Sequence, residues 1–120
     1  MMTNAKTQTE VLNSDVEILS VSKNLIEVRM FGENTHISKD YLNWALGEVI
    51  GWQQGRSNFT AKLMGLIAKA DSSNKRKIAK GFATEVFAYF LWYHKRGLIE
   101  CERSAEYMWE LRKWLEESSK

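Results

Sequence analysis

The chain has 120 residues, of which 44% are hydrophobic and 12% aromatic, and this composition excludes a disordered or fibrous protein. The length suits one domain, since single domains cluster at about 100–150 residues. No apolar run reaches the roughly 18–20 residues of a membrane span, and the first residues lack the apolar stretch of a signal peptide. We therefore expect a cytoplasmic protein that does not enter a membrane, and the lone Cys101 fits a reducing compartment.

The net charge of +2 conceals an uneven distribution of charged residues. Residues 56–96 hold nine basic and two acidic groups, whereas the rest of the chain holds eight basic and thirteen acidic groups. This asymmetry predicts either a surface for an anionic partner or complementary charges within the protein.

The N-terminal part of the chain predicts a flexible tail followed by strands. Residues 1–14 are polar and predict the tail, so that residues 15–120 form a single globular domain. Residues 16–21 and 25–31 alternate apolar and polar positions around the turn residues 22–24, which predicts a β-hairpin. A second turn is predicted at residues 32–34, followed by a short third strand or an extended lead into a helix at residues 35–37.

The first predicted helix runs from about Lys39 to Gln54, with Ser38 as its cap and Gly55 as its end. Its core face is predicted to consist of Leu42, Ala45, Leu46, Val49 and Ile50. A neighbouring stripe contains Tyr41, Trp44, Glu48 and Trp52. Aromatic rings beside a carboxylate favour a cationic or planar ligand, and the alternative is that this stripe widens the buried face.

Two further helices are predicted in the basic part of the chain. Ser57 or Asn58 opens the first, which extends to about Ala70 and has as its inward residues Phe59, Leu63, Leu66 and Ile67. The second covers residues 75–81 with Ser73 or Asn74 as its cap. Cations in its first turn oppose the helix dipole, which favours an external anion. The candidate residues for binding an anion or nucleic acid are Lys75, Arg76, Lys77 and Lys80.

A run of eight apolar or aromatic residues, 86–93, predicts a buried central helix over residues 84–97, capped by Thr84, around which the rest of the protein packs. The sector predicted to face the core contains Val86, Phe87, Phe90, Leu91, Tyr93 and His94. The opposite side places Tyr89 and Trp92 among charged residues. Together with Arg96 they form a candidate partner-binding surface, and the alternative is that they lie beneath a neighbouring helix.

A last helix is predicted over residues 104–117. The complete pattern predicts an α+β fold, mainly α, with an N-terminal β-hairpin packed on a bundle of four to five helices.

The sequence gives little support for catalysis. His36 and His94 lie on separate elements, and no His-x-x-x-His or Cys-x-x-Cys spacing occurs, so we expect no metal site. No glycine-rich phosphate loop is present, and we expect no cofactor. No catalytic residue is assigned, although catalytic groups need not be close in sequence.

Within residues 58–92, the part that begins at Phe82 reads Phe-Ala-x-Glu-Val-x-x-Tyr-x-x-Trp. Residues 58–92 resemble a helical segment of short proteins from phages and other mobile elements, in which the second part often reads Phe-Pro-x-Glu-Val-x-x-Tyr-x-x-Trp, so that Ala83 stands in place of the proline. Such proteins include inhibitors of bacterial defence systems. The resemblance implies an accessory, host-interacting or inhibitory role and no catalytic residue.

These patterns favour a non-catalytic module that binds another protein or forms a homodimer through aromatic side chains and the basic segment. The first alternative is nucleic-acid binding through residues 75–80. The second is a small-molecule or enzyme site near Trp44, Glu48 and Trp52.

Overall fold

The computed structural model describes residues 10–95 and 113 and has an α+β fold that is mainly α, as predicted. The strands are β1 (Glu10–Asn13), β2 (Val16–Val21), β3 (Leu25–Met30) and β4 (Glu33–Ser38). The helices are α1 (Lys39–Gln53), α2 (Phe59–Lys69), α3 (Ser72–Gly81) and α4 (Ala83–Lys95). The helix predicted over 104–117, together with Arg96 and Cys101, lies outside the described residues.

The strands form one antiparallel sheet in the order β1-β2-β3-β4, with the predicted hairpin, β2 and β3, at its centre. The prediction of a tail over residues 1–14 is wrong for residues 10–13, because these pair with β2. The second turn also lies earlier than predicted: Phe31 and Gly32 both have positive φ, 53° and 84°. A two-residue turn of this kind matches the twist of the strands that it joins.

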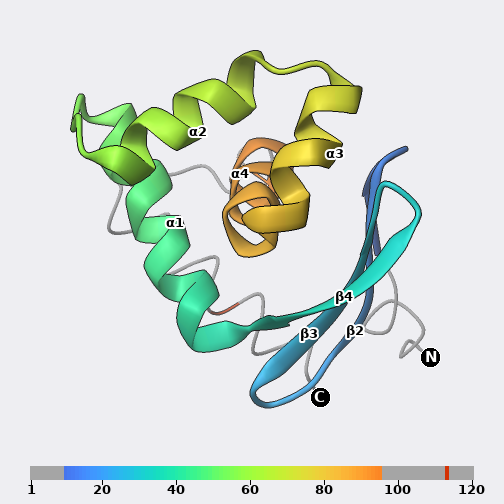
Figure 1. Ribbon diagram of the computed structural model, residues 1–120. Coiled ribbons are helices and arrows are strands. Elements are labelled where there is room, and N and C mark those ends of the chain that lie inside the picture. The colour runs from blue at the N-terminus through green and yellow to red at the C-terminus, as the bar shows by residue number, and fades with distance from the viewer. Residues whose placement is uncertain (1–9, 96–112, 114–120) are drawn as a thin grey trace.

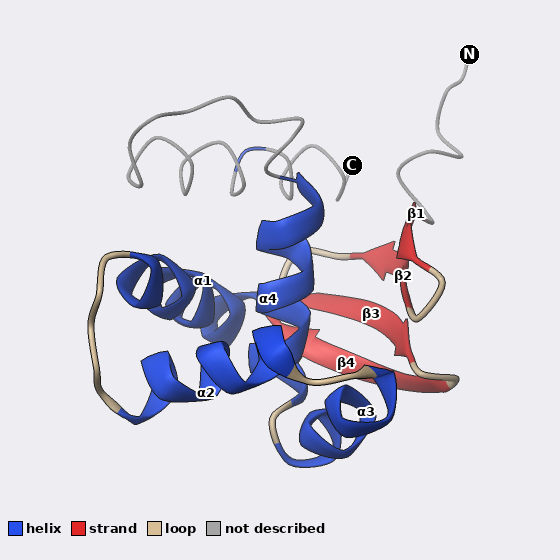
Figure 2. Ribbon diagram, turned by 90° about the horizontal axis from the view of Figure 1, so that it is seen from above, coloured by secondary structure: helices blue, strands red, loops and turns tan. Residues whose placement is uncertain are grey.

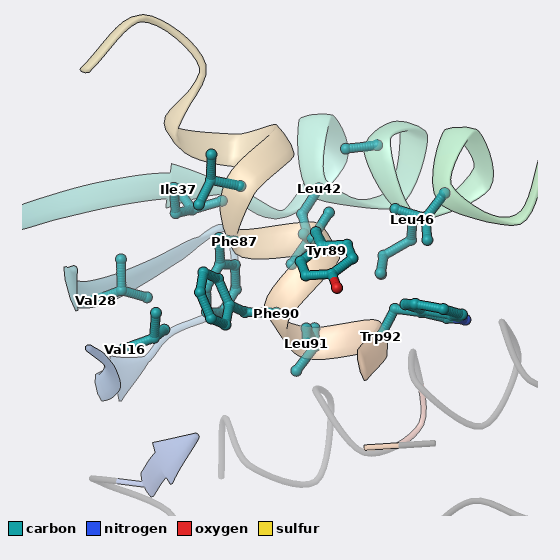
Figure 3. Close-up of a cluster of buried hydrophobic side chains, with 14 of the residues drawn as sticks. Val16, Val28, Ile37, Leu42, Leu46, Phe87, Tyr89, Phe90, Leu91 and Trp92 are labelled. Atoms are coloured by element: carbon teal, nitrogen blue, oxygen red, sulfur yellow. The ribbon is translucent and has the colours of Figure 1, made fainter. Parts of the chain in front are cut away.

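Helix α4 is the centre of the protein. Figures 1 and 2 show α1, α2 and α3 on successive sides of α4 and the sheet on the remaining side. Every residue from Thr84 to Trp92 is buried, which confirms the prediction of a buried helix around which the chain packs. In Figure 3, Phe87 and Phe90 lie toward Val16 and Val28 of the sheet, and Tyr89 lies beside Leu42 of α1.

The start of α4 and the position of one of its side chains differ from the prediction. The Val86 N–H donates to the Phe82 carbonyl oxygen (3.0 Å), so the helix begins before Thr84, and Thr84 lies in the first turn rather than at the cap position. Tyr93, predicted to face the core, is half exposed (50%). No described helix is both long and apolar enough to cross a membrane.

Helix α1 follows its local sequence signals closely. The Ser38 hydroxyl accepts a hydrogen bond from the Tyr41 N–H (3.3 Å), as a cap does. Gly55 has φ +91° beyond the end of the helix, a conformation that glycine adopts without a Cβ clash. The predicted core face is confirmed by the buried residues Leu42, Ala45, Leu46 and Val49 and the partly buried Ile50.

Candidate functional site

Three large apolar side chains are exposed where α2 faces α3. The exposed fractions are 69% for Phe59, 56% for Leu66 and 37% for Phe82. The rings of Phe59 and Phe82 lie 6.0 Å apart. They border a cavity of about 390 Å³, here called the α2–α3 groove, which is lined by Phe59, Lys62, Leu63, Leu66, Lys77, Ile78, Gly81 and Phe82.

The groove owes its form to the orientation of α2. Asn58 caps this helix by accepting the Ala61 N–H (2.9 Å). Leu63 and Ile67 then lie inward and are buried, as predicted. The prediction that Phe59 and Leu66 also face the core is wrong, because both are exposed: α2 is an outer helix, and the other described elements lie on one side of it (Figure 1).

A second cavity of about 380 Å³ adjoins the groove on the other side of α2. It is called the Trp52 cavity and is lined by Trp52, Arg56, Ser57, Ala61, Lys62, Gly65, Leu66 and Lys69. Lys62 and Leu66 line both cavities. The lining residues of the two cavities include lysines and an arginine but no carboxylate, so this surface of the described chain favours an acidic or apolar partner over a cationic one.

The predicted partner-binding aromatics are not on the surface. Tyr89 and Trp92 are each only 8% exposed, and both rings pack against Trp52, at centroid distances of 6.3 and 5.8 Å. The alternative stated for them, burial beneath a neighbouring helix, is therefore correct. When other elements pack around a helix, even the side that carries charged residues is buried. The periodicity of one helix does not show which other elements will pack against it.

The candidate ligand stripe on α1 divides into separate parts. Tyr41 and Trp44 are exposed, and their rings lie 5.2 Å apart. Glu48 instead accepts hydrogen bonds from Arg56 (3.2 Å) and Asn58 (3.3 Å) and so ties the α1–α2 turn together. The Trp52 ring packs against Tyr89 and Trp92 of α4. The stripe therefore does not form one site in which aromatic rings flank a free carboxylate.

A short hydrogen bond joins α1 to the buried start of α4. The Tyr41 hydroxyl donates to Glu85 Oε2 at 2.6 Å, and Glu85 is only 4% exposed. This hydrogen bond raises the pKa of Tyr41 above its ordinary value of 10.0, and burial and the negative charge of Glu85 act in the same direction. The bond explains how a carboxylate is accommodated in the wall of the core.

The four basic residues predicted to bind an anion do not converge. Helix α3 begins at Ser72 with Asp71 as its cap, so these cations follow the first turn, and the predicted conflict with the dipole is absent. Lys75 donates to the Ala70 carbonyl oxygen, and Lys77 lines the α2–α3 groove. The other two, Arg76 and Lys80, line a separate hollow of about 180 Å³ beside Glu33.

Two other ionisable groups have distinct surroundings. The His94 ring stacks on the Phe90 ring, with the centroids 5.8 Å apart and an angle of 2° between the ring planes. Desolvation lowers the pKa of His94 below 6.5. Lys39 is 8% exposed, and its Nζ has no hydrogen-bond partner among the described residues. Within residues 10–95 and 113, no group of three or more His, Cys, Asp and Glu side chains could hold a metal ion.

The three exposed apolar residues Phe59, Leu66 and Phe82 are not among the site residues predicted from the sequence. A signal was nevertheless present, since Phe59, Lys62, Leu66 and Lys69 follow one another at helical spacings of three, four and three residues. A stripe that alternates apolar and cationic residues is a poor core face, because buried lysines cost free energy.

No protein family model, curated protein or solved structure matches this chain.

Proposed function

We propose that this domain is a non-catalytic protein-binding module that takes an apolar segment of a partner protein into the α2–α3 groove. The observation that carries the proposal is the exposure of Phe59, Leu66 and Phe82 around one cavity of about 390 Å³. Burying apolar surface stabilises a complex by roughly 25 cal/mol per Å². Aromatic side chains beside a concave surface are also typical of the centres of protein interfaces.

The chemistry of the lining supports binding rather than catalysis. Lys62 and Lys77 are the only titratable residues among those that line the groove, and neither has a described carboxylate or histidine beside it in the lining. The cations on α3 point to different parts of the surface, which gives less support to the nucleic-acid alternative. Residues 58–92 resemble a segment of accessory proteins from mobile elements, and this resemblance implies a host-interacting role. The proposed partner is therefore a protein of the host cell.

A photo-activated cross-linker placed at residue 59 tests the proposal. The control carries the same benzophenone side chain at residue 44, where Trp44 is 45% exposed but lies outside the groove. After irradiation in host extract, we expect position 59 to give a protein adduct that position 44 does not give and that nuclease treatment leaves unchanged. Equal products at both positions, or an adduct lost with nuclease, would overturn the proposal. A self-adduct alone would identify a homodimer instead.

A further inference from the structure

The exposed face of α2 alternates apolar and cationic side chains. Phe59, Lys62, Leu66 and Lys69 are all exposed. Phe59 and Leu66 are separated by seven residues, as are Lys62 and Lys69, which corresponds to about 10 Å along a helix. Two apolar positions and two cations therefore repeat at the same interval along one ridge.

The two cavities beside this ridge differ in chemistry. The α2–α3 groove is lined by five large apolar side chains and two lysines, whereas the Trp52 cavity is lined by two large apolar side chains, Trp52 and Leu66, and three cations, Arg56, Lys62 and Lys69. Arg56 is already paired with Glu48 at 3.2 Å. Lys62 and Lys69 have no ion pair with another described residue. These two ammonium groups, both on exposed side chains, are therefore not neutralised by a carboxylate of the described residues.

We infer that the occupant of this surface is an acidic amphipathic helix of the partner protein, an inference that rests on the proposed protein-binding function. Its apolar side chains, seven residues apart, lie against Phe59 and Leu66, and its carboxylates lie against Lys62 and Lys69. A seven-residue apolar repeat is the spacing at which two helices pack side by side. A strand does not fit, because positions about 10 Å apart are three residues apart and point to opposite faces.

The probe is a labelled peptide of roughly 20 residues, since shorter isolated helices are marginal in water. It carries leucine in a seven-residue repeat with glutamate at the flanking positions, and a second peptide has lysine in place of every glutamate. Fluorescence anisotropy with the full chain should show binding of the acidic peptide that weakens as salt is raised. The basic peptide should bind at least about tenfold more weakly.

The double variant Lys62→Glu/Lys69→Glu should reverse this preference. The matched control, Lys23→Glu/Lys80→Glu, makes the same change in net charge at two exposed lysines outside both cavities and should retain the wild-type preference. Circular dichroism establishes that both variants are folded. Equal binding of the two peptides, no binding of the acidic peptide, or the same effect from both double variants would overturn the inference.

The two proposals fail separately. If residue 59 cross-links a nuclease-resistant protein while the domain does not distinguish the peptides, the acidic-helix inference is wrong and the protein-binding function remains. If residue 59 gives no specific protein adduct, the proposed function is wrong as well. Displacement of the acidic peptide by single-stranded DNA at equal concentration would assign the cations to nucleic acid and overturn the inference.

Discussion

Removing the hydroxyl group of Tyr41 should destabilise the protein through Glu85. The Tyr41→Phe substitution keeps the ring that packs on Trp44 (5.2 Å) but removes the donor at 2.6 Å from Glu85 Oε2. Glu85 is 4% exposed, so the carboxylate loses a partner in a place that water reaches poorly. A hydrogen bond to a charged group contributes about 1.5–3 kcal/mol to stability.

We expect Tyr41→Phe to lower the free energy of unfolding by about 1.5 kcal/mol, the lower limit of this range. The reason is that Tyr41 itself is 45% exposed, so that solvent can partly replace its hydroxyl. For a domain of this size the corresponding fall in Tm is about 6 °C. Urea unfolding followed by tryptophan fluorescence measures the free energy. The same substitution in a Glu85→Gln background should cost less, since the amide oxygen accepts the bond without a charge.

The effect should also depend on pH in a definite direction. The pKa of Tyr41 in the folded protein is raised above 10.0 by Glu85, so folding favours the protonated phenol. The contribution of the Tyr41 hydroxyl to the stability of the folded protein is therefore complete below about pH 10. It is lost as the pH rises through the raised pKa of Tyr41. The difference in stability between wild type and Tyr41→Phe should shrink above pH 10.

Tyr93→Phe is the matched control, because Tyr93 is similarly exposed (50%) and no hydrogen bond of its hydroxyl occurs within the described chain. It should change the free energy of unfolding by less than about 0.5 kcal/mol. The reasoning about Glu85 is refuted if Tyr41→Phe is equally neutral, or if its effect stays the same from pH 7 to pH 11.

Three further predictions concern packing. Phe87→Ala should cost about 3–5 kcal/mol because Phe87 is fully buried, whereas Phe59→Ala should cost less than about 1 kcal/mol, both measured by urea unfolding. Gly47→Ala should stabilise α1 by about 1 kcal/mol. Gly51→Ala should stabilise α1 less, since its Cβ would lie 3.0 Å from the Arg56 guanidinium, which would have to shift away from its position beside Glu48; equal Tm gains would contradict this. Lys39→Met should raise stability by about 1 kcal/mol, because it removes a buried amine that has no hydrogen-bond partner among the described residues, and a lower Tm would disprove this prediction.

Local signals predicted the positions of most elements. The Ser38 cap and Gly55 mark the ends of α1 because each satisfies a requirement of the backbone at its own position. The alternation of residues on both sides of 22–24 likewise predicted β2 and β3. The same reasoning misplaced the start of α3, because Asp71, Ser73 and Asn74 are all good caps and local chemistry does not choose among them.

The candidate site was less predictable than the fold. Sequence periodicity indicated an apolar face on α2, but Phe59 and Leu66 belong to the side that no described element covers. Trp92 was considered for the surface and is instead packed against Trp52. In each case the outcome depends on which elements surround a helix, and that information is contained in no single segment.

Sequence patterns alone predicted a mainly helical α+β domain with a buried helix near residues 84–95, since eight consecutive apolar residues can be removed from water only in a core. The packing of the elements establishes that α4 is buried from Thr84 to Trp92, which includes Tyr89 and Trp92, and that Tyr41 of α1 donates a hydrogen bond to Glu85. The same arrangement places α2 in the outer layer (Figure 1) and leaves Phe59 and Leu66 on its second face exposed. Burial is a property of how layers pack together, whereas caps, turns and periodicity belong to the segments themselves.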